Sequence, residues 1–292
     1  MNLKLSKNEI FVLEKLCSNE YSVGELAREL EMKGSYVSRL VKTLEEKGLV
    51  YHTEKRKMAL SPASHAQSFK RLYFSRPQAR IEEWLCGYST GVLAILTTWQ
   101  EGAPMDIFWE ETPCSKPTTY KVLNRLMDAG VLIKNEKIRI SDKTVEEFAS
   151  DYVSNLLRIA TSKIQGMKTS IGVRLHVVVR AHTNEAPQEF VQTGMTALVE
   201  YGLEAMQTSN NFYYYTNLSG KQRKIGVDEA FIHALLMTTL EQNQDKQVLA
   251  LFLMKNKSKM NIANLRELAK QYAVEGELAT MRDALDYVEK AV

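Results

Sequence analysis

Residues Gly34–Ser61, GSYVSRLVKTLEEKGLVYHTEKRKMALS, decide how the chain is interpreted. Apolar residues recur at helical spacing in the first half of this stretch, at Val37, Leu40, Val41 and Leu44. Ser35 is placed to act as the N-cap of that helix, and Gly48 as the left-handed residue that ends it. Two segments expected to be short strands, residues 50–53 and 58–60, then flank a basic turn. The pattern predicts the second helix of a helix-turn-helix followed by a two-stranded wing.

The residues upstream supply the rest of the motif. Ser6 and Ser22 are each followed three residues later by a glutamate, the pattern of a capping box, and each box precedes an apolar stripe. Only residues 31–34 separate the second predicted helix from the Ser35 cap. We therefore expect a winged helix over residues 1–62.

The polar face of this unit is suited to double-stranded DNA. A helix fits the major groove, and a cationic hairpin beside it can contact the adjoining phosphates. An amphipathic helix with a solvated basic face is the plainer alternative, but the order of helices, glycine stop, strands and basic turn favours DNA binding. The candidate residues are Ser35, Tyr36, Ser38, Arg39, Lys42, Lys55, Arg56 and Lys57.

The charge distribution agrees with this assignment. The chain has 292 residues and a formal charge of +3. Residues 1–87 hold 15 Lys and Arg against 11 Asp and Glu, a net of +4, whereas residues 88–141 hold six of each and are neutral. Residues 142–292 hold 17 against 18, a net of −1. The positive excess lies with the predicted winged helix, as phosphate binding requires.

An internal repeat follows. Residues 120–132 have the layout of residues 38–50 at an offset of 82, so that Leu126 falls on Leu44 and Gly130 on Gly48. Predicted helices at 92–99 and 105–109 precede it, and strands at 132–134 and 137–140 follow it. A second winged helix over residues 88–141 is expected, with candidate DNA contacts at Lys116, Thr118, Thr119, Lys121 and Arg125. Its wing tip lacks the lysine–arginine cluster, so a protein-binding role for this copy stays open.

The remaining regions complete an α+β fold class: two tandem winged helices and a mixed C-terminal domain with a helical end. Residues 63–87 are expected to be a helical connector, residues 142–168 a bridging helix capped by Asp142, and residues 169–292 the C-terminal domain. The apolar stripe from Val145 to Ile159 fits either a domain bridge or a homodimer seam. Residues 166–172 are expected to be a loosely structured connection, where the composition of the chain changes. Strands are expected at residues 173–180, 190–193, 212–216 and 224–227, and helices at 231–240, 248–254, 262–272 and 278–288.

No pattern of enzyme chemistry is present. Three cysteines are far apart, five histidines show no ligand spacing, and Gly220-Lys221 lacks the rest of a phosphate-binding loop. Asp228 and Glu229 are interpreted as acidic residues that begin a helix. We expect no catalysis, no cofactor and no metal. With no signal segment or transmembrane run, the protein is expected in the cytoplasm and away from membranes.

One C-terminal motif resembles a known family. Residues 191–203, VQTGMTALVEYGL, resemble the signature of AbiEi-like regulators, the antitoxins of type IV abortive-infection systems. Residues 225–230 resemble the strand-to-helix segment of that family, and residues 265–272 its closing helical run. The resemblance implies a winged-helix transcriptional regulator whose C-terminal domain binds a protein partner or ligand, although this chain carries two predicted winged helices.

Three functions are therefore compared. The leading hypothesis is a DNA-binding transcriptional regulator, a repressor, that uses the first winged helix. The second is an antitoxin-type or interaction protein whose domains bind partner proteins, with a homodimer as a further expectation. The third, a nucleotidyltransferase-like enzyme in the C-terminal part, is disfavoured because no paired-aspartate motif follows a Gly-Ser turn.

Overall fold

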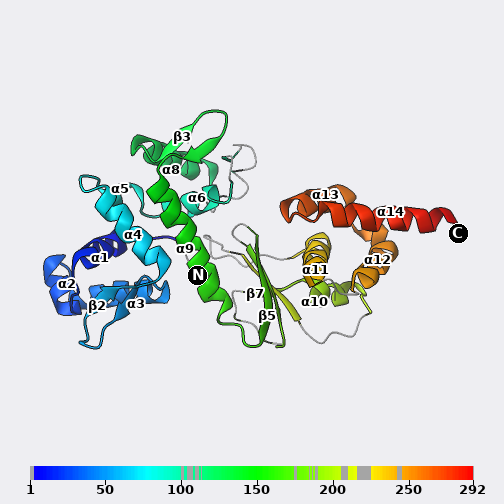
Figure 1. Ribbon diagram of the computed structural model, residues 1–292, viewed down its shortest axis with the longest axis horizontal. Coiled ribbons are helices and arrows are strands. Elements are labelled where there is room, and N and C mark those ends of the chain that lie inside the picture. The colour runs from blue at the N-terminus through cyan, green and yellow to red at the C-terminus, as the bar shows by residue number, and fades with distance from the viewer. Residues whose placement is uncertain are drawn as a thin grey trace. The chain divides into compact units, whose positions relative to one another are not determined.

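The computed structural model forms two compact units, residues 1–160 and residues 161–215 with 222–292. It describes residues 3–99, 102–103, 108, 112, 114–173, 176–183, 185, 187, 190–204, 210–215, 225–241 and 245–291. The fold class is α+β, with helices and small antiparallel sheets and a winged-helix domain at the N-terminus (Figure 1).

The first unit is helical apart from two hairpins. Its described elements are α1 (Lys7–Ser18), α2 (Val23–Glu29), α3 (Gly34–Glu46), β1 (Val50–His52), β2 (Met58–Leu60), α4 (Ser64–Ser75), α5 (Ile81–Trp84), α6 (Ser89–Leu96), α8 (Lys116–Asp128), β3 (Leu132–Lys134), β4 (Ile138–Ile140) and α9 (Lys143–Thr161). Of the helix predicted at residues 105–109, only Phe108 lies among the described residues, and it is helical.

Side-chain caps begin the first two helices. Ser6 Oγ accepts a hydrogen bond from Glu9 N, and the Glu9 carboxylate accepts one from Ser6 N. Ser22 and Glu25 repeat the arrangement before α2. Both capping boxes predicted from the sequence are confirmed, because each leaves two otherwise free backbone donors satisfied.

The prediction for the start of α3 was wrong. The N-cap is Lys33, whose carbonyl accepts from Val37 N, so Ser35 lies inside the helix and makes no cap hydrogen bond. The helix begins earlier than expected because Gly34 already adopts helical geometry. Ser35 is left exposed on the first turn.

The end of α3 follows the prediction. Gly48 has φ of +70°, and Leu49 N donates to Leu44 O while Gly48 N donates to Glu45 O. This pair of hydrogen bonds is a Schellman cap, which needs the left-handed conformation that glycine adopts without steric cost. The chain then enters β1, which pairs with β2 from Val50–Leu60 to His52–Met58.

The same backbone pattern recurs at α8. Gly130 has φ of +66°, Val131 N donates to Leu126 O, and β3 pairs with β4 as β1 pairs with β2. Each hairpin also gains a short third strand, through the bridges Tyr21–Met58 and Ala103–Ile138. The elements α3 and β1 map onto α8 and β3 at an offset of 82, and β2 maps onto β4 at an offset of 80.

Helices α4 and α9 pack side by side along their lengths (Figure 1). Asp142 caps α9 by accepting from Thr144 N and Val145 N, as predicted. The apolar stripe of α9 is buried: Val145, Phe148, Tyr152 and Leu156 are at most 2% exposed. Within the first unit, the chain itself therefore covers these four residues of the stripe, and both the bridging role and the homodimer stay predictions.

The second unit is a four-stranded sheet with helices packed on it. Its described elements are β5 (Met167–Val173), β6 (His176–Ala181), β7 (Phe190–Gln192), α10 (Gly194–Leu198), η1 (Val199–Tyr201), β8 (Asn210–Tyr215), α11 (Val227–Glu241), α12 (Asp245–Asn256), η2 (Lys257–Lys259), α13 (Ile262–Gln271) and α14 (Glu275–Ala291). The strand order is β5-β6-β8-β7, and every neighbouring pair is antiparallel.

Three predictions in this unit need correction. Residues 167–172 are strand rather than a loosely structured connection, because β5 pairs with β6 along its length. The strand expected at residues 173–180 is consequently the second of a pair. Ile225 and Gly226 are not in a strand, and α11 begins at Val227. The helical end is confirmed by α11 to α14, and residues 228–238 of α11 are buried on every face.

Candidate nucleic-acid interface

Helix α3 separates an apolar face from a polar one. Val37, Leu40, Val41 and Leu44 are buried against the rest of the winged-helix domain. The opposite face exposes Ser35, Ser38, Arg39 and Lys42 to solvent. Helix α3 thus presents four of the predicted contact residues at once, with a cation at two of them.

Tyr36 is held in place rather than freely exposed. Its hydroxyl oxygen accepts a hydrogen bond of 2.8 Å from Asn8 Nδ2 in α1, and its side chain is half-buried. The Arg39 guanidinium carbon lies 5.6 Å from the centre of the Tyr36 ring, a cation–π distance. Tyr36 therefore orients Arg39 at the surface as well as offering its own ring edge.

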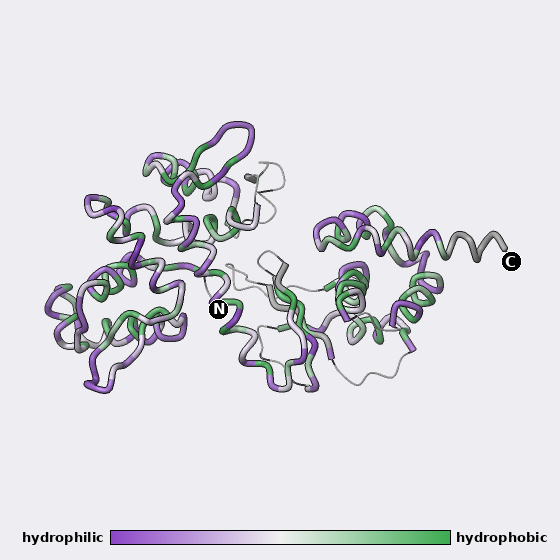
Figure 2. Tube along the Cα trace, in the orientation of Figure 1, coloured by the Kyte–Doolittle hydropathy of each residue, from purple (hydrophilic) through white to green (hydrophobic). Residues whose placement is uncertain are grey.

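The wing presents its cations at the tip of the β1–β2 hairpin, which Figure 2 shows as hydrophilic. Lys55 and Arg56 are exposed and Lys57 is half-buried. Arg56 has φ of +58°, and Thr53 fixes the turn through bonds with Lys57 O and Arg56 N. The tip is therefore an ordered turn with its positive groups directed outward from the domain.

Glu25, at the start of α2, faces this cationic hairpin. Hydrogen bonds from the Ser22 backbone and side chain lower the pKa of Glu25, and the charges of Lys57 and Arg28 lower it further. The carboxylate is thus ionised at neutral pH and offsets part of the charge of Lys57. Lys55 and Arg56 carry the larger share of the wing's free positive charge.

One cation of the positive excess is committed inside the domain. Lys47 Nζ lies 2.6 Å from Glu9 Oε1 and donates to Lys4 O at 2.7 Å, and both charged side chains are almost fully buried. The pair joins the end of α3 to the start of α1. Lys47 directly precedes Gly48, the residue that ends the helix, so the sequence could have indicated that Lys47 is the C-cap and not a surface cation.

The residues predicted for the second copy separate into two groups. Lys116 and Lys121 are exposed on α8 and Thr118 is half-buried. Thr119 is fully buried, and its hydroxyl bonds Thr112 and Ser115 O, so the prediction of a DNA contact there was wrong. The cause is register, because Thr119 falls on the core residue Val37 at the repeat offset.

Arg125 is also directed inward. Its Nη2 donates to Cys86 O at 3.0 Å and to Ser89 Oγ at 2.7 Å, and its Nη1 lies 3.7 Å from Cys86 Sγ. The guanidinium therefore fastens α8 to the segment before α6. These bonds hold two of its nitrogens within the domain, and the DNA contact predicted at Arg125 stays a prediction.

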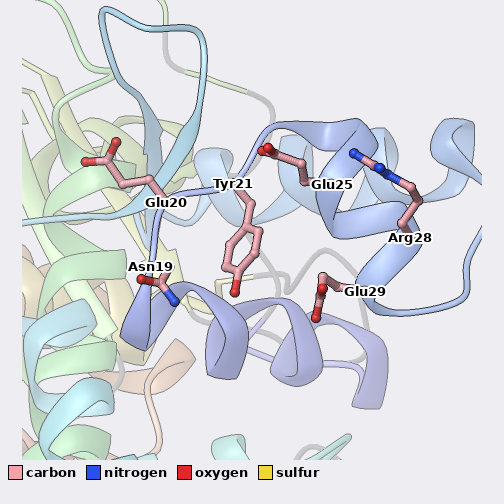
Figure 3. Close-up of a pocket in the computed structure, with 6 residues that line it drawn as sticks. All are labelled: Asn19, Glu20, Tyr21, Glu25, Arg28 and Glu29. Atoms are coloured by element: carbon pink, nitrogen blue, oxygen red, sulfur yellow. The ribbon is translucent and has the colours of Figure 1, made fainter.

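A polar pocket lies beside the interface, between the end of α1 and α2 (Figure 3). Its lining residues are Asn19, Glu20, Tyr21, Glu25, Arg28 and Glu29. Glu29 is paired with Lys15 at 3.0 Å. With three carboxylates around it, the pocket is unsuited to phosphate and marks the edge of the cationic surface.

The described residues contain no group of three or more His, Cys, Asp or Glu side chains able to hold a metal ion. Asp228 accepts from Asn261 N and Asn264 Nδ2, which ties α11 to α13 and supports the structural interpretation of this acidic pair. No helix among those described is long and apolar enough to cross a membrane.

Comparison with known proteins gives one finding. Residues 3–57 match the model of the MarR family, which supports a winged-helix regulator. The matched segment contains α1, α2, α3 and the β1 strand, and it ends at the tip of the wing. No curated protein and no solved structure matched the chain.

Proposed function

We propose that the protein is a transcriptional regulator, acting as a repressor, that binds double-stranded DNA through α3 and the β1–β2 wing. The observation that carries the proposal is the exposed face of Arg39 and Lys42 beside the cationic tip of Lys55 and Arg56, in a domain that matches the MarR family. A helix in the major groove and a hairpin on the adjacent backbone would use these two surfaces together. A bound repressor of this kind would occlude its own promoter.

The sharpest test is salt dependence. In the triple variant Lys55→Gln, Arg56→Asn and Lys57→Gln, asparagine tolerates the positive φ at position 56. For every phosphate that the variant no longer neutralises, the slope of log K against log salt should become shallower by about 0.9. The matched control is a basic set in the other unit, Lys255→Gln, Lys257→Gln and Lys259→Gln, all exposed in the parent. Fluorescence anisotropy with genomic fragments would measure both.

The control removes the same formal charge from residues that are not part of the proposed interface. We expect it to leave the slope close to that of the parent protein. Equal slopes in all three proteins would show that the wing makes no phosphate contact, and absence of binding by the parent at low salt would contradict the function itself.

A second proposal concerns residues 169–292, which we infer to be an AbiEi-like partner or ligand domain, with antitoxin activity as its candidate role. It is supported by the order strand β7, short helix α10 and the left-handed Gly202, with φ of +91°, over the motif that resembles the family. Purification of the chain with the product of a neighbouring gene, followed by a growth-rescue assay, tests this. If that product is not toxic, the antitoxin role is excluded while DNA binding is unaffected.

A further inference from the structure

The two copies of the repeat meet each other at equivalent positions. Leu5 lies two residues before α1, and Gly87 lies two residues before α6, so the two are related by the offset of 82. They form an antiparallel bridge in which Gly87 N donates to Leu5 O at 2.7 Å. A rotation that exchanges the two copies would map this pair onto itself. The bridge therefore lies where a local two-fold axis between the two copies would pass.

A second, independent contact obeys the same symmetry. Helices α4 and α9 each follow a hairpin, and they run antiparallel: Arg76 pairs with Asp142 near one end and Ser64 with Asn155 near the other. At their centre, the Phe69 and Phe148 rings lie 5.6 Å apart. The position equivalent to Phe69 at the offset of 80 is residue 149, next to Phe148. The residues that meet at the middle of the α4–α9 pair are thus nearly equivalent positions of the two copies, as a two-fold axis between the copies requires.

The carbonyl that precedes each first helix is bonded alike in both copies. Lys47 Nζ donates to Lys4 O, and Arg125 Nη2 donates to Cys86 O. Lys4 and Cys86 are themselves related by the offset of 82. One donor follows the end of α3 and the other lies on α8, the two helices that would enter DNA. The C-cap of α3 and the α8 helix are therefore each bonded to the segment that precedes the first helix of their own copy.

From these contacts we propose that residues 88–141 form a second winged helix, related to the first by a local two-fold axis, and that one chain binds an inverted pair of unequal half-sites. The inference rests on the proposed DNA-binding function. In homodimeric helix-turn-helix proteins, the two-fold axis between subunits is what makes a site palindromic. Here the axis lies within a single chain, and a flexible tandem would impose no such orientation.

The two half-sites are unequal because the two surfaces differ. At the offset of 82, Arg39 is replaced by Lys121, Lys42 by Asn124 and Gly34 by Lys116, so each helix exposes two cations. The second helix has no guanidinium at the position of Arg39, and with it loses the bidentate contact that arginine makes. The second hairpin carries Asn135 and Glu136 where the first carries its basic tip. The first copy should bind the stronger half-site and the second the weaker.

The experiment is a selection of binding sites from random duplexes with the full chain, followed by native mass spectrometry of the selected complex. We expect two unlike half-sites in inverted orientation and one chain per duplex. Arg39→Ala should remove base preference in one half only, and Lys121→Ala in the other only. Scrambling either half should weaken binding roughly tenfold or more. Inserting about five base pairs between the halves, half a helical turn, should also weaken it.

The outcomes separate this inference from the function on which it rests. Direct repeats, a single half-site, or two chains per duplex would overturn the local two-fold reader while leaving DNA binding through α3 intact. If both variants altered the same half, the second copy would not read DNA. Circular dichroism of Arg39→Ala and Lys121→Ala would check that these exposed substitutions leave the fold unchanged. Absence of binding to any duplex would overturn both proposals.

Discussion

Gly48 and Ile159 meet where α3 passes into the hairpin: a Cβ atom at position 48 would lie 2.9 Å from Ile159 Cδ1. The glycine is needed twice there, once for its φ of +70° and once for the close approach of α9. Gly130 has nearly the same φ, of +66°, but no atom lies within 4 Å of the equivalent Cβ position among the residues that the structure describes. Comparing substitutions at Gly48 and Gly130 therefore distinguishes the cost of a positive φ from the cost of steric overlap.

The first prediction uses this difference. Gly130→Ala should lower the free energy of unfolding by about 1–2 kcal/mol from the left-handed conformation alone. Gly48→Ala should lower it somewhat further, because the terminal methyl of Ile159 must move aside for the added Cβ atom. Urea denaturation of both variants checks the order. In an Ile159→Val background, which deletes the Cδ1 atom, the excess cost of Gly48→Ala should largely disappear. An equal cost in both backgrounds would show that α9 does not press on this turn.

The second prediction concerns Tyr152, which is fully buried on the side of α9 that packs against α4. Its hydroxyl has no hydrogen-bond partner among the described residues, and burial raises the pKa of this phenol well above its ordinary value. Tyr152→Phe removes an unsatisfied polar group and should raise the free energy of unfolding by about 1 kcal/mol. Tyr272→Phe is the matched control, since the Tyr272 hydroxyl donates to Glu229 Oε1 at 3.4 Å. Tyr272→Phe should lower the free energy of unfolding. Relative to the parent protein, the melting temperature should therefore rise for Tyr152→Phe and fall for Tyr272→Phe.

The third prediction separates specificity from affinity on α3. Arg39 alone on this face can make a bidentate contact with guanine, which is worth about 1–3 kcal/mol of discrimination. Arg39→Ala should therefore relax base preference at one or two positions. Lys42→Ala should weaken binding to all sequences about equally. Site selection with both variants measures this, and an unchanged preferred sequence for Arg39→Ala would assign base recognition elsewhere.

The fourth prediction is a pH dependence of stability from Glu14. Burial, together with the nearby charge of Glu82, raises the pKa of Glu14 from 4.5 to about 7. The folded state then binds the proton more tightly than the unfolded state, so this group favours folding most at low pH. Its contribution should fall as the pH rises from about 4.5 to about 7, a window set by those two pKa values.

Unfolding curves at pH 5 and pH 8 would test the sign. Glu14→Gln should be more stable than the parent at pH 8 and should lose that advantage at pH 5. Glu20→Gln, on the exposed segment after α1, is the control and should show the same difference from the parent at both values. A pH-independent effect of Glu14→Gln would remove the titration of this carboxyl as its cause.

The local parts of the fold were predictable because short-range chemistry determines them. Capping boxes at Ser6 and Ser22 and the glycine stops at Gly48 and Gly130 need only a few neighbouring residues. The alignment of the repeat could also have predicted that Thr119 is buried, because the equivalent residue of the first copy is the core residue Val37. An exposed-face assignment for Thr119 ignored that alignment.

The long-range parts were not predictable in this way. Nothing in residues 1–10 or 85–90 indicates that Leu5 pairs with Gly87, because a single bridge leaves no periodic pattern. The inward direction of Arg125 depends on the carbonyl of Cys86, which becomes its neighbour only when α6 and α8 pack. From its charge and its position in the helix alone, Arg125 cannot be distinguished from an exposed arginine.

The repeat has a consequence for how the protein can change over generations. A homodimer carries every substitution twice, so a mutation in its gene alters both halves of its target together. In this chain, Arg39 and Lys121 are encoded separately. A mutation at one leaves the other as it was. In the proposed two-copy reader, the preference of each copy would therefore drift independently, while the bridge between Leu5 and Gly87 is inherited unchanged.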